Sequence, residues 1–134
     1  MNIFVPLARI LLGVTFTVFG LNGFLHFIKI PPPEGVAGQF MRALTVSHYL
    51  VPVFALQVTA GVLLLANRFV PLALAILAPI IVNIALYHVL MVAHGLVMAI
   101  VTTLLWAIVF HHERAAFAGL LARRPEQAGP PDRF

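Results

Sequence analysis

The sequence predicts an all-α membrane protein: a transmembrane four-helix bundle with a short interfacial helix between its first and second spans. Hydrophobic residues make up 62% of the 134 residues and charged residues only 9%, against roughly 25% charged in soluble domains. A soluble fold of this size cannot bury so much apolar surface. Lipid is therefore expected to surround most of the chain.

A long uncharged stretch gives the second observation. No Asp, Glu, Lys or Arg occurs from Phe69 to Phe110. As one helix this stretch would be ~63 Å long, about twice the ~30 Å thickness of the hydrocarbon layer. We therefore expect two spans, 71–91 and 94–110, with a tight reversal in the Met91–Gly95 region, where His94 and Gly95 are the turn-prone residues.

Two further apolar stretches precede them and predict spans 3–27 and 49–66. The first is long, has no A-x-A site and is followed by three more spans, so it is interpreted as a span and not as a cleaved signal peptide. Between them, Pro31-Pro32-Pro33 ends any helix. Apolar residues at i, i+4 spacing then predict the short interfacial helix; they are Val36, Ala37, Phe40, Met41 and Leu44.

Charge predicts the orientation. Residues 1–112 form the predicted membrane domain, and residues 113–134 form a predicted basic cytoplasmic tail. The tail is expected to begin as an amphipathic helix (Phe117, Leu120 and Leu121) and to end in a partly disordered Pro/Gly segment. Most positive residues fall on the side of the two termini, namely Arg9, Arg68, Arg114, Arg123, Arg124 and Arg133, and only Lys29 and Arg42 on the other. The positive-inside rule places both termini in the cytoplasm, and we expect an integral protein of the bacterial inner (plasma) membrane.

The same charges and the absence of cysteine exclude some functions. The positive residues are few and flank apolar blocks, so the lipid bilayer, and not nucleic acid, is the predicted partner. Without cysteine there are no disulfides, thiolate metal sites or dithiol relays.

Polar residues inside the spans are the candidate site. The predicted topology brings His26, His48, His88 and His94 to one non-cytoplasmic face. Polar groups continue below them along one stripe of each helix, and these stripes predict a cavity open to that face. The candidate ligand- or cofactor-binding residues are Asn22, His26, Gln57, Asn83, Tyr87 and His88. No metal site is predicted, because the histidine spacing within each helix is not a metal signature.

Simpler interpretations stay open. The amides can serve only as hydrogen bonds between packed helices, each worth roughly 0.6 kcal/mol. Histidines at the interface can simply be solvated. A b-type haem between His26 and His88 is a further alternative.

The strings ARILLGVTFTVFGLNGFLHF and LQVTAGVLLLANRFVPLALAILAPIIVNIALYH resemble the DoxX-like family. The resemblance covers about residues 8–117 and implies a small four-helix integral membrane protein. It matches Arg9, Asn22, Gln57, Asn83 and His88 to the family pattern. Many relatives are expected to carry glutamate where this chain has Gln57, which removes a titrating group but keeps a hydrogen-bonding amide.

The leading functional prediction is a quinone- or redox-associated membrane subunit. A quinone needs an apolar slot with one or two hydrogen-bond donors. The chain has no flavin, iron–sulfur or c-type haem motif, so electron transfer requires a redox protein partner. The alternative is a non-enzymatic scaffold, lipid-binding or assembly partner protein, acting through Arg114, Arg123 and Arg124. A small transporter that works as a homo-oligomer is a third possibility, and whether the chain is an enzyme stays open.

Overall fold

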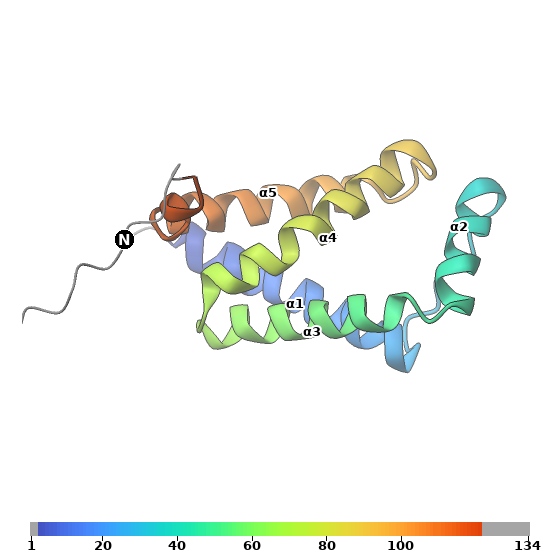
Figure 1. Cartoon of the computed structure of the whole chain (residues 1–134), viewed down its shortest axis with the longest axis horizontal. Coiled ribbons are helices and arrows are strands. Elements are labelled where there is room, and N and C mark those ends of the chain that lie inside the picture. Colours follow the sequence, from blue (N-terminus) through green and yellow to red (C-terminus); the bar gives the residue numbers. More distant parts are fainter. Residues whose placement is uncertain (1–2, 122–134) are drawn as a thin grey trace, which may run out of the picture.

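The computed structural model describes residues 3–121, and its regular structure in that range is entirely helical, as predicted (Figure 1). The elements are α1 Phe4–Leu25, α2 Gly35–Val46, α3 Leu50–Ala66, α4 Val70–Leu90, α5 Leu96–Glu113 and the 3-10 helix η1 Arg114–Leu121.

Several of these helices suit a membrane. Three stretches are long and apolar enough to cross one: α1, α4, and α5 continued into η1. Helix α3 has 17 residues, near the lower limit of about 17 for a span, and α2 meets it at an angle of 86°. If this bent pair counts as one span, the number rises to four. These lengths and compositions are those of an integral membrane protein.

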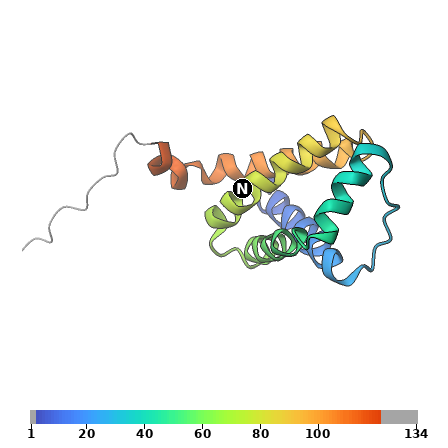
Figure 2. The same ribbon diagram turned by 45° about the vertical axis from the view of Figure 1, so that its right-hand side comes forward.

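The long helices pack in a ring. Helix α1 lies along α3, α4 contacts both α3 and α5, and α5 closes back onto α1. Toward the α4–α5 turn, α4 diverges from α3, and α2 lies at this open end (Figures 1 and 2). The opposite end holds the α3–α4 turn, the start of α1 and η1 (Figure 1).

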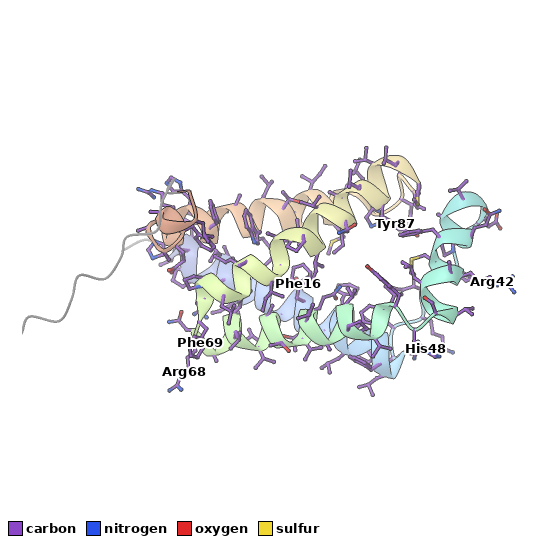
Figure 3. The ribbon with its side chains drawn as sticks, in the orientation of Figure 1. Phe16, Arg42, His48, Arg68, Phe69 and Tyr87 are labelled. Atoms are coloured by element: carbon purple, nitrogen blue, oxygen red, sulfur yellow. The ribbon has the colours of Figure 1, made fainter. Side chains whose placement is uncertain are left out.

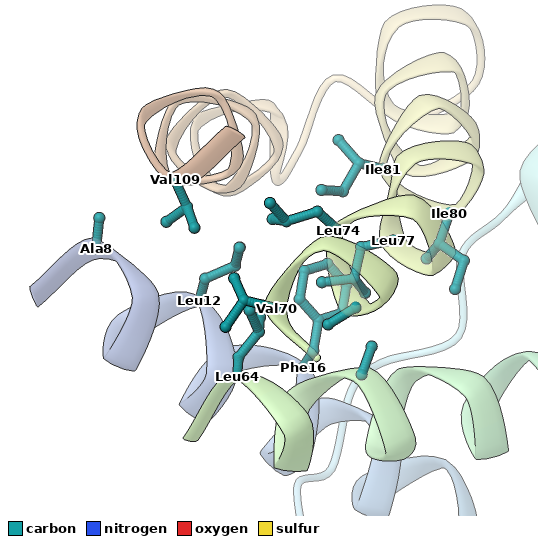
Figure 4. Close-up of a cluster of buried hydrophobic side chains, with 12 residues drawn as sticks. Ala8, Leu12, Phe16, Leu64, Val70, Leu74, Leu77, Ile80, Ile81 and Val109 are labelled. Atoms are coloured by element: carbon teal, nitrogen blue, oxygen red, sulfur yellow. The ribbon is translucent and has the colours of Figure 1, made fainter. Parts of the chain in front are cut away.

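The apolar core fills only part of the ring. Its largest fully buried side chains come from all four long helices and meet as shown in Figure 4; they are Leu12, Phe16, Leu64, Leu74, Leu77 and Val109. Helix α3 has no buried residue before Gln57, and α4 has none after Ile81. The packed core therefore stops where α3 and α4 begin to diverge.

Residues in the left-handed backbone conformation lie at several helix ends. His26, His48, Asn67 and Phe69 have φ between 52° and 58°, and His and Asn are enriched among the residues that tolerate this conformation. His26 ends α1 after Leu25, slightly earlier than the predicted limit at residue 27. Gly95, with φ 92°, starts α5 at Leu96, so His94 lies in the turn and not in the last helix.

The predicted short helix exists as α2, a separate element from α3; its place in the membrane interface stays a prediction. The predicted tail helix takes a different form. Helix α5 runs on to Glu113 and is followed by the 3-10 helix η1, not by a continuous α-helix. The predicted roles of Arg123 and Arg124 and the predicted disorder of the Pro/Gly end lie outside the described residues.

Candidate functional site

Gln57 lies at the boundary between the packed core and the diverging helix halves. It heads the buried face of α3, followed at helical spacing by Ala60, Gly61 and Leu64. Its side chain is only 8% exposed. Within residues 3–121 its amide makes no hydrogen bond, although an amide offers two N–H donors and a carbonyl acceptor. Gln57 is thus a largely buried side chain whose amide atoms stay accessible and have no protein partner in the described part of the chain.

Glycines of α1 hold α3 close on both sides of Gln57. A Cβ placed on Gly20 would lie 3.1 Å from the Gln57 Cβ and 2.7 Å from Val58 Cγ2. One turn further, a Cβ on Gly23 would lie 2.3 Å from the Phe54 ring. Small residues at such positions allow two helix backbones to approach each other. This contact fixes the base of the Gln57 side chain against α1.

Helix α2 meets the end of α4 through aromatic rings. Tyr87 points toward α2 (Figure 3), and its ring centroid lies 6.1 Å from that of Phe40. The rings of His88 and Tyr87 meet at an interplanar angle of 77°, with centroids 5.1 Å apart. The Tyr87 hydroxyl has no hydrogen-bond partner within residues 3–121. The open end therefore carries a second hydrogen-bonding group with capacity to spare.

Other predicted site residues make local backbone contacts. The Asn22 carboxamide accepts from the Ile28 N–H at 2.7 Å and donates to the Ile28 carbonyl at 3.3 Å. This pair of bonds holds the chain that leaves α1. Asn83 is exposed and donates to the Pro79 carbonyl of its own helix at 2.8 Å. Asn83 therefore does not share the buried position of Gln57.

The histidines have separate surroundings. The His88 ring nitrogen Nδ1 lies 3.1 Å from the Val92 carbonyl; because a carbonyl can only accept, the hydrogen bond puts a proton on Nδ1. His26 is an exposed, left-handed helix end, and His48 and His94 are also exposed. Among the described residues, no three His, Cys, Asp or Glu side chains are grouped so that they could hold a metal ion.

Three features were not anticipated from the sequence. The Thr17 hydroxyl oxygen is buried against α3 without a hydrogen-bond partner in the described part of the chain. The Arg9 guanidinium bonds the Leu64 carbonyl. A groove at the α1–α5 end is lined by His111, His112 and Arg114. The basic run after an apolar helix was visible in the sequence, but its pairing with the start of α1 was not.

The six predicted site residues therefore divide into two groups. Gln57 and Tyr87 make no side-chain hydrogen bond within residues 3–121, whereas Asn22, Asn83 and His88 bond nearby backbone and His26 ends a helix. An unpaired amide and a phenol in apolar surroundings can bind a neutral ligand that carries carbonyl or hydroxyl groups.

Comparison with family models, with curated proteins and with solved structures finds no match to this chain.

Proposed function

We propose that this chain is a DoxX-type integral membrane protein that binds a quinone-class ligand at Gln57, as the membrane subunit of a redox assembly. The proposal takes the four long apolar helices as four spans, in the bacterial inner membrane, with both termini cytoplasmic. A bound quinone would supply two-electron, two-proton chemistry. A partner protein would exchange the electrons, since the sequence carries no other redox motif.

The observation that carries the proposal is the unpaired amide of Gln57. A polar group left unsatisfied in a bilayer costs several kcal/mol, so a ligand that pairs with it gains affinity. The Nε2 hydrogens can donate to a quinone carbonyl. The Oε1 oxygen can accept from the hydroxyl of the reduced form. An amide thus suits both redox forms without titrating, which an ionised glutamate cannot do.

The surroundings support this choice of ligand. Below Gln57 the core is apolar and closely packed. Above it, α3 and α4 diverge, and their side chains there are exposed or half-buried. The Tyr87 hydroxyl offers a second hydrogen-bonding group at the same end of the protein. A ring with polar oxygens and an apolar body matches these surroundings, because ligand sites combine apolar walls with a few placed polar groups.

The test is photolabelling of the full-length protein in lipid nanodiscs with a short-chain azidoquinone. We expect labelled peptides from the Gln57 region and competition by unlabelled quinone. Gln57→Leu keeps the side-chain volume but removes the hydrogen bonds, and should weaken competition about three- to tenfold. Thr59→Val, on the exposed face of the same helix, is the matched control and should bind normally.

Thermal stability without ligand provides an independent readout. If the Gln57 amide is unpaired, Gln57→Leu should stabilise the ligand-free protein by about 1–3 kcal/mol. A loss of stability would mean that the amide serves helix packing. Unchanged quinone competition in Gln57→Leu would also overturn the proposal.

A further inference from the structure

The end of the protein opposite α2 carries a groove between the start of α1 and the last turns of α5. Its volume is about 750 Å³, within the range of about 300–1,000 Å³ typical of ligand sites. One wall is apolar and is formed by Val5, Leu104, Ala107 and Ile108. The groove does not involve Gln57 or any other residue of the proposed quinone site.

The rim of the groove is basic. His111, His112 and Arg114 line it, and all three are exposed. Arg114 donates one guanidinium N–H to the His111 carbonyl at 2.7 Å, which holds its side chain back along α5. Its other N–H groups have no partner within residues 3–121. Arg114 therefore has donors available for an anion.

One acidic residue, Glu113, lies next to the rim residues His112 and Arg114 in the chain. The only acidic residues among residues 3–121 are Glu34, before α2 at the other end of the protein, and Glu113. Neither lines the groove, and no arginine forms an ion pair in the described range. Arg68 lies at the same end of the molecule (Figure 3). Arg114 is therefore the charged side chain that lines the groove, and within residues 3–121 it is not paired with a carboxylate.

The change from apolar wall to basic rim takes about one turn of α5, from Ile108 to His111 and His112. Trp106 and Phe110 lie in the same part of α5. Their rings are stacked nearly parallel, with centroids 4.8 Å apart. Trp106 donates its indole N–H to the Leu74 carbonyl at 3.0 Å, so this pair packs against the core. The polarity of the groove thus follows the step from acyl chain to headgroup in a bilayer.

We propose that this groove binds one anionic phospholipid. An acyl chain lies along Val5, Leu104 and Ile108, and the phosphate is held by Arg114 with the imidazoles of His111 and His112. Basic pockets between membrane helices are suited to anionic headgroups, and arginine forms strong charge-assisted hydrogen bonds to phosphate. A neutral lipid contacts the apolar wall but lacks the negative charge that Arg114 binds. Inorganic phosphate binds the rim but has no acyl chain for the wall.

Competition between lipids tests the proposal. The delipidated full-length protein is offered equal amounts of phosphatidylglycerol and phosphatidylcholine with identical acyl chains, and retained lipid is counted by native mass spectrometry. We expect phosphatidylglycerol to be preferred about fivefold, the effect of about one basic side chain. Arg114→Gln should bring the ratio close to one. Arg68→Gln, an exposed arginine at the same end but outside the groove, should keep it.

Two further arms separate the headgroup from the chain. Ala107→Phe fills the apolar wall and should reduce retention of both lipids at unchanged thermal stability. Inorganic phosphate should compete at least tenfold more weakly than the lipid. Equal retention of the two lipids, equal effects of Arg114→Gln and Arg68→Gln, normal retention by Ala107→Phe, or phosphate competing as well as lipid would each overturn the proposal. None of these outcomes depends on quinone binding.

Discussion

Arg9, in the second turn of α1, donates a guanidinium hydrogen bond to the backbone carbonyl of Leu64 near the end of α3. The last carbonyls of a helix lack partners within it, and they favour a nearby cation. The Leu64 carbonyl also accepts from the Asn67 N–H at 3.2 Å, so Arg9 adds a second donor to it and joins the two helices at the end where the core is packed. It also gives a charged side chain within an apolar helix a structural role.

Removing this bond should destabilise the protein. We expect Arg9→Met to lower the free energy of unfolding by about 1.5–3 kcal/mol, the usual contribution of a hydrogen bond from a charged group. Thermal unfolding in mild detergent measures the change. Arg68→Met is the control, because Arg68 is exposed and should cost little. Equal effects of the two substitutions would contradict a specific role for the Arg9–Leu64 bond.

The α1–α3 contact should depend on Gly61. A Cβ at this position would lie 2.3 Å from the Thr17 hydroxyl oxygen and 2.7 Å from the Thr17 backbone nitrogen. Since backbone cannot move aside cheaply, Gly61→Ala should cost about 1–3 kcal/mol through overpacking. Gly119→Ala is the control, as nothing lies within 4 Å of a Cβ there. A neutral Gly61→Ala in thermal unfolding would mean that the helices are less closely packed than described.

His26 should act through its backbone conformation. With φ 52° it adopts a left-handed conformation, which costs a non-glycine residue roughly 1–2 kcal/mol. His26→Gly should therefore maintain or raise the thermal stability, and His26→Val should lower it. His94→Val, at an exposed position without a positive φ, should change little. If His26→Gly abolished quinone photolabelling while keeping the fold, the imidazole would have a binding role after all.

The Phe40–Tyr87 contact should hold α2 against the end of α4. An aromatic pair contributes about 0.5–1.5 kcal/mol, so Phe40→Ala should speed amide hydrogen exchange in α2 roughly two- to tenfold. Exchange in α1 and α3 should stay as it was. Val36→Ala, at a highly exposed α2 position, is the matched control. Unaltered exchange in Phe40→Ala would show that other contacts hold α2.

The positions of the helices could be predicted closely because they depend on local properties of the chain. A span needs enough consecutive apolar residues, and a turn needs residues such as Gly95 that tolerate unusual backbone angles. Both are visible in the sequence. The helix limits predicted at residues 27 and 94 lie instead at Leu25 and Leu96, because the left-handed residues His26 and Gly95 end and start these helices at places that hydrophobicity alone does not mark.

The roles of the polar residues were harder to predict, because hydrogen-bond partners depend on which helices meet. Asn22 and Asn83 both seemed to belong to a cavity, yet one bonds the chain after α1 and the other its own helix. Gln57 looked no different in the sequence. Its burial and lack of a partner follow from the close approach of α1 at Gly20 and the divergence of α4.

The sequence by itself determined the helical class, the apolar lengths and the suitability for a membrane, since these follow from composition and local periodicity. Only the tertiary structure decided which polar groups are left unpaired and where the grooves lie. The basic groove joins Val5 to residues 104–114, about a hundred positions later in the chain. Such a pairing arises from how helices pack against one another, a non-local contact that no single stretch of sequence encodes.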